Sequence, residues 1–600
     1  MTVPDDQRTT PEGVGVSPSL APLLELEGMS RHPTLLGREV WRLAALAILI
    51  GAISFVLAML LLKFIGLLTN LCFYGRFSFS FADPTSAYLG LGVIGVPIAG
   101  ALVVGFMARF GDAGIRGHGI PEAMETILTN ESRIPKRITL LKPISAAISI
   151  GTGGPFGAEG PIIATGGAFG SLVGQILHTT ANERKILLSA GAAAGMAATF
   201  GSPVSAVLLA VELLLFEFRA RSLIPVALAS ATAAGLRIIV MGDKPIFAMP
   251  NVGPPEHWSL IIYATIGIIA GVAAAGVTRL LYLVEDGFKK YSHVHWMWWP
   301  AMGAVVVGLC GYLDNHSMGV GYDNISHLLT GGMALKAILL LLILKWISWT
   351  VALGSGTSGG TLAPLFTLGS ALGLLLGMAA AHLFPDSGVD VRMAALVGMA
   401  ALFTGASRAL LTSIVFAFET TMQPHGLLPL LAGCSTAFLV SCVMLRDTIM
   451  TEKIARRGIH VRTEYSTDFM DRLFVRDALS RNVVALGAED TCAATRTKLA
   501  TDERYKLYGG FPVVDWNQHL LGVLTDHDLI NPDIPPETKL KDLMHRPPAV
   551  IYSDCSLRQA DDMMRRHHVG RLIVINREKP LQIVGIITRD DLLAAHRKYG

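Results

Sequence analysis

Long apolar stretches dominate the first three quarters of the chain. Residues 43–62 form a run of 20 residues without a charge, which is long enough for a helix to cross a bilayer once. Similar uncharged runs occupy residues 84–108, 258–278 and 426–445, and residues 346–385 carry no Lys, Arg, Asp or Glu. Other apolar segments are short and interrupted by Gly or Pro, so we expect tilted, re-entrant or half-length helices among them. The pattern predicts an α-helical protein that crosses the membrane many times.

Charge changes this picture at the C-terminal end. The chain is 52% hydrophobic, and 44 of its 95 charged side chains lie in residues 451–600, which make up only a quarter of its length. The preceding residues have too few charges to cover a water-exposed surface. We therefore expect a soluble domain behind a membrane domain. The net charge of +3 does not indicate a nucleic-acid partner.

The termini and the connections suggest how the chain lies in the membrane. Residues 1–36 are polar and predict a disordered cytoplasmic leader without the pattern of a signal peptide. Basic connections at residues 133–137 and 219–221 should face the cytoplasm, with Arg456, Arg457 and the soluble tail on the same side. The six cysteines have no metal or disulfide spacing, which fits a reducing cytosolic side. These features predict a multi-pass protein of a bacterial inner (plasma) membrane, with no metal site and no required cofactor.

An internal repeat is the most informative feature of the apolar part. Gly151, Gly157, Pro161, Gly166, Gly170 and Gly174 recur as Gly354, Gly360, Pro364, Gly369, Gly373 and Gly377, always 203 residues later. At the same offset, the Gly-Met-Ala-Ala sequence that begins at Gly195 recurs at Gly398. A shared offset in two separate blocks predicts two related halves, about 41–240 and 257–450, within a membrane domain of residues 41–460.

Glycine-rich breaks at matching positions of two halves point to a transport site. A helix that begins inside the membrane leaves several N–H groups unpaired and about half a positive charge at its N-terminus. Glycines allow a ligand to approach the backbone closely. This environment favours an anion, because a cation would need carboxylates or helix C-termini.

Three motifs carry a family resemblance. They are Gly117-His-Gly-Ile-Pro121-Glu122, Gly157-Ala-Glu159-Gly-Pro161 and Gly359-Gly-Thr-Leu-Ala-Pro364. In this order they resemble the motifs of the CLC chloride channels and chloride/proton antiporters. The resemblance implies a homodimer with one anion pathway per subunit and inverted halves, whereas the repeat alone indicates only a duplication. The pathway residues that it implies are Gly117, His118, Gly119, Ile120, Pro121, Gly157, Ala158, Gly160, Pro161, Gly360, Thr361, Leu362 and Met450.

Glu159 is the first candidate for a functional side chain. It is the only Asp or Glu between Pro143 and Asn182, and an ionisable group in such apolar surroundings is costly. Its carboxylate could occupy the place of the anion, and protonation would release it. In the family resembled, this position holds the gating glutamate, which competes with chloride and carries protons. The structural alternative is a cap at a helix N-terminus.

The sequence departs from the family pattern at three positions. His118 replaces a serine that contacts the anion in the family. The histidine would either donate a hydrogen bond to the anion or lie at a helix end and face a water-filled vestibule. Met450 replaces an inner tyrosine that contacts the anion in the family, so the hydrogen bond from that tyrosine would be lost. Leu213 stands where antiporters carry an inner glutamate, and Glu212 beside it and Glu419 in the second half are interpreted as helix-end residues. We therefore expect anion transport that is not limited to chloride, of the passive channel type, with chloride/proton antiport as the alternative.

The soluble tail contains a smaller repeat. Gly522-Val-Leu-Thr-Asp-His-Asp-Leu recurs as Gly585-Ile-Ile-Thr-Arg-Asp-Asp-Leu, each after a β-like segment and before a predicted helix. The pattern resembles the CBS domain and predicts an α/β pair at residues 471–531 and 538–600. By resemblance, Thr525, Asp528, Thr588 and Asp591 are candidates for binding an adenosine nucleotide. The alternative is that these residues only cap the following helices.

Other function classes have weaker support. Gly356-Thr-Ser358-Gly359 matches the motif around the nucleophile of intramembrane serine proteases, with His382 downstream as the candidate base. The repeat already accounts for this segment, however, since Pro155 stands at the position that matches Ser358. A cation or magnesium channel would need clustered intramembrane carboxylates, and a nucleotide-driven pump would need a phosphate-binding loop motif that the sequence lacks. We therefore expect a transport protein and not an enzyme.

Overall fold

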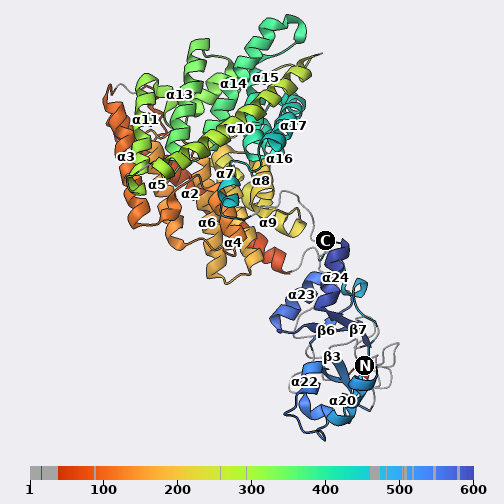
Figure 1. Ribbon diagram of the computed structural model, residues 1–600. Helices are drawn as coiled ribbons and strands as arrows, with labels where there is room; N and C mark the ends of the chain where they lie inside the picture. Colours follow the sequence, from red (N-terminus) through yellow and green to blue (C-terminus); the bar gives the residue numbers. More distant parts are fainter. Residues whose placement is uncertain are drawn as a thin grey trace. The chain divides into compact units, whose positions relative to one another are not determined.

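The computed structural model describes residues 15–16, 38–86, 89–256, 258–291, 293–459, 470, 473–481, 483–502, 505, 510–516, 519–544, 549–576 and 582–599. The chain divides into two compact units, Arg38–Tyr465 and a second unit formed by Met1–Gly37 with Ser466–Gly600 (Figure 1). Of the predicted leader, only Gly15–Val16 are described. They form strand β1, which pairs in parallel with residues 519–520.

The regular elements of the membrane unit are all helices, with no strands among its described residues. Eight of the helices there are long and apolar enough to cross a membrane, as the uncharged runs predict. Others are short, with 10 residues in α4, 8 in α8 and 9 in α12, which confirms the expected half-length helices. The first half contains α2 (Arg38–Tyr74), α3 (Gly92–Phe110), α4 (Ile120–Thr129), α5 (Lys136–Gly151), α6 (Glu159–Ile176), α7 (Ala181–Phe200), α8 (Pro203–Ala210) and α9 (Ala220–Met241).

The second half repeats this order of elements. It contains α10 (Ser259–Tyr291), α11 (Trp299–Leu313), α12 (Tyr322–Thr330), α13 (Leu335–Gly354), α14 (Leu362–Leu383), α15 (Val391–Ser407), α16 (Leu410–Thr421) and α17 (Leu427–Met444), followed by the short α18 (Glu452–Ala455). The packing repeats as well. Helices α6 and α7 pack together like α14 and α15, and α2 packs on α9 as α10 packs on α17. The duplication inferred from the sequence is therefore present in the structure.

The repeated glycines allow these helices to pack closely. A Cβ atom on Gly191 of α7 would collide with the carbonyl oxygen of Gly166 on α6. In the second half, a Cβ atom on Gly398 of α15 would collide with the carbonyl oxygen of Gly369 on α14. Small residues at such crossings let two backbones come into contact, which stabilises helix packing in a membrane.

A reciprocal pair of caps shows that the halves are inverted. Glu212, at the end of α8, accepts hydrogen bonds from the backbone N–H groups of Leu411 (3.0 Å) and Thr412 (3.0 Å) at the start of α16. Glu419, near the end of α16, accepts from Val204 (2.9 Å) and Ser205 (2.8 Å) at the start of α8. Each helix can cap the start of the other only if the two run antiparallel. Because α8 and α16 are equivalent helices, the two halves have opposite orientations.

The soluble unit contains two small sheets. One has the order β1-β4-β3-β2 and the other β5-β6-β7, and in each an antiparallel pair, β3–β4 or β6–β7, precedes a helix. Apolar side chains of β3, β4, β5, β6 and β7 form one cluster, which buries the two sheets together as expected for a CBS pair. Besides β1, the soluble unit contains β2 (Leu486–Gly487), α20 (Cys492–Thr501), β3 (Gly510–Val514), β4 (His519–Thr525), α22 (Asp526–Ile530), β5 (Val550–Tyr552), α23 (Leu557–Arg566), β6 (Arg571–Asn576), β7 (Gln582–Thr588) and α24 (Arg589–Tyr599).

Candidate anion-binding site

The three glycine motifs, far apart in the sequence, meet in the membrane unit. The backbone N–H of Gly117 donates to the carbonyl oxygen of Thr357 (3.0 Å), and that of Gly360 donates to Gly157 (3.1 Å). Gly117 and Gly119 have φ angles of +95° and +96°, which residues with a Cβ atom rarely adopt. The motifs thus form a set of tight turns, each of which leads into a helix.

The helices that follow these turns begin close to one another. A Cβ atom on Gly160, at the start of α6, would collide with the carbonyl oxygen of His118 just before α4 and lie 3.0 Å from the Cα atom of Gly360 just before α14. The N-termini of α6 and α14 have no side-chain cap. Their unpaired N–H groups and partial positive charges create a site that favours an anion.

Glu159 places its carboxylate in this site. The residue is fully buried, and its Oε2 atom lies so close to Gly157 that a Cβ atom there would collide with it. The carboxylate also faces the backbone amide of Ala363 at the start of α14. Tyr322 donates a hydrogen bond of 2.6 Å to Oε1, whereas Oε2 has no partner among the described residues. The carboxylate therefore lies beside the uncapped N-termini of α6 and α14.

Two polar groups beside these helix ends lack partners. The Nδ1 atom of His118 and the hydroxyl of Thr361 are buried, and neither makes a hydrogen bond to any part of the chain that the structure describes. Both groups are able to donate to an anion.

A basic cavity leads to His118 and Gly119. It has a volume of about 780 Å³, and its lining residues include six cationic side chains and three glutamates. These are Arg116, Lys142, Lys289, Lys453, Arg456 and Arg457, with Glu122, Glu125 and Glu285. The excess of positive charge raises the local concentration of anions at the motif of α4.

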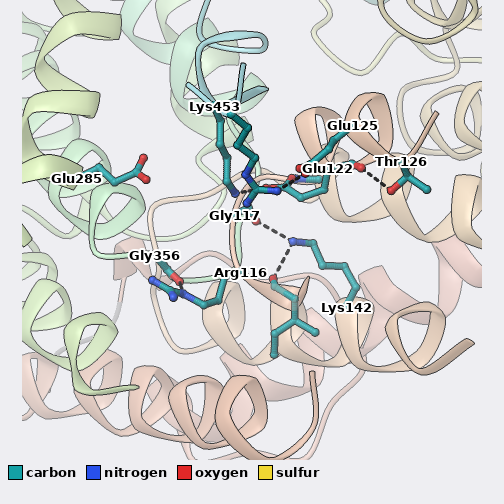
Figure 2. Close-up of polar contacts among 12 residues, drawn as sticks. Arg116, Gly117, Glu122, Glu125, Thr126, Lys142, Glu285, Gly356 and Lys453 are labelled. Atoms are coloured by element: carbon teal, nitrogen blue, oxygen red, sulfur yellow. Dashed lines mark hydrogen bonds and ion pairs between the residues drawn. The ribbon is translucent and has the colours of Figure 1, made fainter. Parts of the chain in front are cut away.

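A partly buried ion pair and the hydrogen bonds of a buried lysine fix the wall of this cavity (Figure 2). The ammonium group of Lys142, on α5, donates to the carbonyl oxygens of Ile115 (2.7 Å) and Gly117 (2.8 Å). Glu122 accepts from Lys453 (2.7 Å) and from the backbone N–H of Gly119 (2.7 Å). The Gly119 amide, which the family resemblance places on the anion path, is thus already bonded to Glu122. The ion pair also joins α4 to α18.

Comparison with known proteins identifies the family. Residues 99–442, more than half of the chain, match the family described as "Voltage gated chloride channel". This chain belongs to the voltage-gated chloride channel family. Residues 475–532 and 540–598 each match the CBS domain. The chain therefore transports anions across a membrane and carries a CBS pair.

Named relatives and solved structures agree with this assignment. The chain is 30% identical over 351 residues to the H(+)/Cl(-) exchange transporter ClcA of Yersinia pestis, an alignment that covers 57% of this chain and 72% of the relative. The crystal structure of a slow cyanobacterial Cl-/H+ antiporter has a TM-score of 0.61 at 23% identity and covers 71% of this chain and 99% of its own. The structure of a eukaryotic CLC transporter has a TM-score of 0.60 at 20% identity and covers 92% and 98%, respectively.

Two residues that depart from the family pattern are buried. Met450 is fully buried in the main apolar core, and its thioether can donate no hydrogen bond to an anion. Tyr282 lies nearby, but its hydroxyl donates to the carbonyl oxygen of Ile449 (2.9 Å). Leu213 is buried in a π-helical turn, Val211–Leu215, that continues α8. Its neighbour Glu212 is occupied in capping α16, as expected for a helix-end residue.

Three polar side chains around the candidate site were not predicted from the sequence. Lys142 in α5 and Lys345 in α13 are cations within otherwise apolar stretches of these helices, a signal that was available in the sequence. Lys345 is fully buried and donates to the carbonyl oxygen of Gly319 (2.9 Å). Tyr322 follows a glycine at the start of a short helix and gave no such signal.

The candidate nucleotide-binding residues are engaged in helix caps. Thr525 donates to Asp528 (2.7 Å), and Thr588 donates to Asp591 (2.8 Å), so that each pair forms a capping arrangement. Ser480 adds a hydrogen bond to Asp591 (3.2 Å). The structural alternative therefore accounts for the contacts of all four side chains.

The protease alternative has no geometric support. Ser358 is fully buried, and its hydroxyl accepts from the hydroxyl of Ser145 (3.2 Å). His382 lies in the last turn of α14, whereas Ser358 precedes the first turn of this 22-residue helix. A helix of that length is about 33 Å long, so this histidine cannot act as a base for Ser358.

Proposed function

We propose that this chain exchanges chloride and other small anions for protons, with Glu159 as the group that gates the anion site and accepts the proton. The observation that carries the proposal is the buried carboxylate at the joined N-termini of α6 and α14. The name of the Yersinia relative, an H(+)/Cl(-) exchange transporter, supports coupling to protons.

The chemistry follows from competition for one positive site. The ionised carboxylate of Glu159 satisfies the N-termini and excludes a second anion. Protonation removes its charge, so that the helix ends then favour an anion that arrives through the basic cavity. Departure of the anion restores the affinity of the site for the ionised carboxylate, which releases its proton. Anion and proton movements are thereby linked at one group.

Two side chains provide hydrogen bonds in place of the family's serine and tyrosine. His118 and Thr361 both have an unpaired polar atom at the site, whereas Met450 offers no donor. An imidazole and a hydroxyl make different contacts from those of the family pattern. We therefore propose that the anion selectivity of this chain differs from that of a chloride-specific pathway.

Passive conduction is the second candidate function. It is favoured by Leu213, which is buried at the position where antiporters of the family carry an inner glutamate. Since Glu212 is hydrogen-bonded to α16, it does not replace that group. Under exchange, protons must therefore reach Glu159 by a route that avoids Leu213.

We further propose a homodimer in a bacterial inner membrane, with the CBS pair in the cytoplasm. An adenosine nucleotide at the CBS pair would have to displace the caps made by Thr525 with Asp528 and by Thr588 with Asp591. Calorimetric titration of the full chain with ATP tests this site, with Thr525→Ala and Thr588→Ala as controls.

Flux measurements test the proposed function. Purified protein is reconstituted into chloride-loaded liposomes with a potassium ionophore that removes the membrane potential, and chloride release and external pH are recorded together. Exchange predicts an alkaline shift outside, in fixed ratio to the chloride released, and loss of the pH change in Glu159→Gln. Chloride release without proton movement would establish passive conduction instead. No flux in the wild type, for any halide or nitrate, would contradict the proposal.

A further inference from the structure

Glu159 receives a hydrogen bond from an aromatic side chain of the other half of the membrane unit. The hydroxyl of Tyr322, the first residue of α12, donates to Oε1 of Glu159 at 2.6 Å. This distance is typical of an O–H group that donates to an ionised carboxylate, a bond about twice as strong as one between neutral groups. It is the one hydrogen bond from a side chain to Glu159 within the described ranges.

The ring of Tyr322 is held by aromatic neighbours on several sides. Its centroid lies 6.1 Å from that of Phe81 in a stacked arrangement. Phe200, at the end of α7, and Phe247 contact it edge-on, with centroid distances of 6.0 and 5.9 Å. The ring therefore cannot swing away without disturbing this packing, and its hydroxyl stays directed at the carboxylate.

Other charged groups surround the pair without bonding to the carboxylate. Lys345 on α13 acts electrostatically on Glu159 and on Asp83. Asp323, next to Tyr322, and His316, which is bonded to Asn324 (2.9 Å), act on Asp83 as well. Among these groups, only Tyr322 donates a side-chain hydrogen bond that fixes the direction of the carboxylate.

We propose that Tyr322 is a positioning residue of the gate: its hydroxyl holds the ionised Glu159 carboxylate in the anion site and thereby sets how readily anions displace it. The inference rests on the proposed function of Glu159. A hydrogen bond to a charged group changes an equilibrium constant, here that for displacement of the carboxylate by an anion, by roughly tenfold. Because the bond favours the ionised form, its loss should also ease protonation of the carboxylate.

The test compares two tyrosines in the full chain. Tyr322→Phe keeps the ring and removes the hydroxyl. Tyr263→Phe is the matched control, since Tyr263 on α10 is buried and its hydroxyl contacts only the backbone N–H of Asp390 (3.2 Å) in the described chain. We expect Tyr322→Phe to raise anion flux above neutral pH by about tenfold and to move the midpoint of acid activation up by about one pH unit. Tyr263→Phe should keep the wild-type pH profile.

A double-mutant cycle separates the possible failures. In a Glu159→Ala background, Tyr322→Phe should have no further effect on flux. If it still changes flux there, the hydroxyl acts through another group and the inference is wrong. The inference also fails, with the proposed function intact, if Glu159→Gln alters the pH profile and Tyr322→Phe does not. If neither variant has an effect, the proposed function fails as well.

A second variant keeps the inference testable if Tyr322→Phe does not fold. Phe247→Leu loosens the packing of the Tyr322 ring and keeps the hydroxyl. It should shift the pH profile in the same direction as Tyr322→Phe but less. An unchanged or opposite shift would contradict the role of the aromatic neighbours in holding the hydroxyl.

Discussion

Helices α6 and α14 occupy equivalent places in the two halves, and both begin beside the candidate anion site without a side-chain cap. Their first residues differ in chemistry. At the offset of 203 residues that relates the halves, Glu159 corresponds to Leu362, and Gly160 corresponds to Ala363. The duplicated backbone thus provides two similar positive helix ends, and in the proposed function a single carboxylate turns one of them into a gate. The candidate site is formed by both halves, but its proposed response to protons comes from the first.

The strongest test of this comparison gives the second half a carboxylate. Leu362→Glu should place a second negative charge at the site, where a helix N-terminus stabilises it by up to about 2 kcal/mol. We expect anion flux at neutral pH to fall by about tenfold or more and to recover in acid. Liposome flux across a pH series measures this, with Leu362→Gln as the uncharged control. Equal flux in the two variants would show that the second helix end is not part of the anion path.

The glycine beside the gate provides the next test. In Gly160→Ala, the new methyl group would collide with the carbonyl oxygen of His118, although alanine is native at the matching position of α14. Overpacking of this kind costs about 1–3 kcal/mol, so we expect a lower unfolding temperature in detergent and reduced flux. Gly276→Ala on α10 is the control, because nothing lies within 4 Å of its Cβ position. A stable and fully active Gly160→Ala protein would contradict the close approach of α4, α6 and α14.

The reciprocal caps should respond alike in the two halves. Loss of a helix cap costs about 0.5–2 kcal/mol, so Glu212→Gln and Glu419→Gln should each reduce stability by a similar amount. Since neither carboxylate lies on the proposed proton route, the ratio of protons to chloride should remain unchanged. Thermal unfolding and coupled flux measurements check both points. A changed ratio in Glu212→Gln alone would assign that residue to proton transfer.

The smallest effect is expected in the soluble unit, where a carboxylate lies in water. Hydrogen bonds from Lys539 and Lys541 lower the pKa of the exposed Glu489 to about 2. A folded-state pKa below the usual value stabilises the fold above about pH 4.5, and this contribution is lost as the pH falls toward 2. Because solvent screens the pair, Glu489→Gln should leave transport unchanged and only weaken the acid dependence of unfolding. A transport defect in this variant would link the CBS pair to the gate.

Sequence reasoning captured the membrane segments, the duplication and the tandem CBS units, because each depends on local pattern. Residues 43–62 lack charge, and the matched glycines share one offset. Glu159 is likewise a candidate from the sequence alone, since an isolated carboxylate in an apolar segment is visible without a structure.

Tertiary contacts explain what the sequence could not provide. Tyr322 lies 163 residues after Glu159 and reaches it only because the two halves pack together. Glu122 looks like an ordinary cap within its motif, yet its carboxylate also binds Lys453, 331 residues away. The inversion of the halves followed from the resemblance alone until the contacts between α8 and α16 showed it.

Anion binding to purified protein tests the central claim, that the Glu159 carboxylate occupies the anion site, most directly. Isothermal titration with chloride at slightly alkaline pH would compare the wild type with Glu159→Ala. If the carboxylate and the anion compete, the variant should bind chloride about tenfold more tightly or bind one more ion per chain. Identical affinity and stoichiometry in the two proteins would contradict the account.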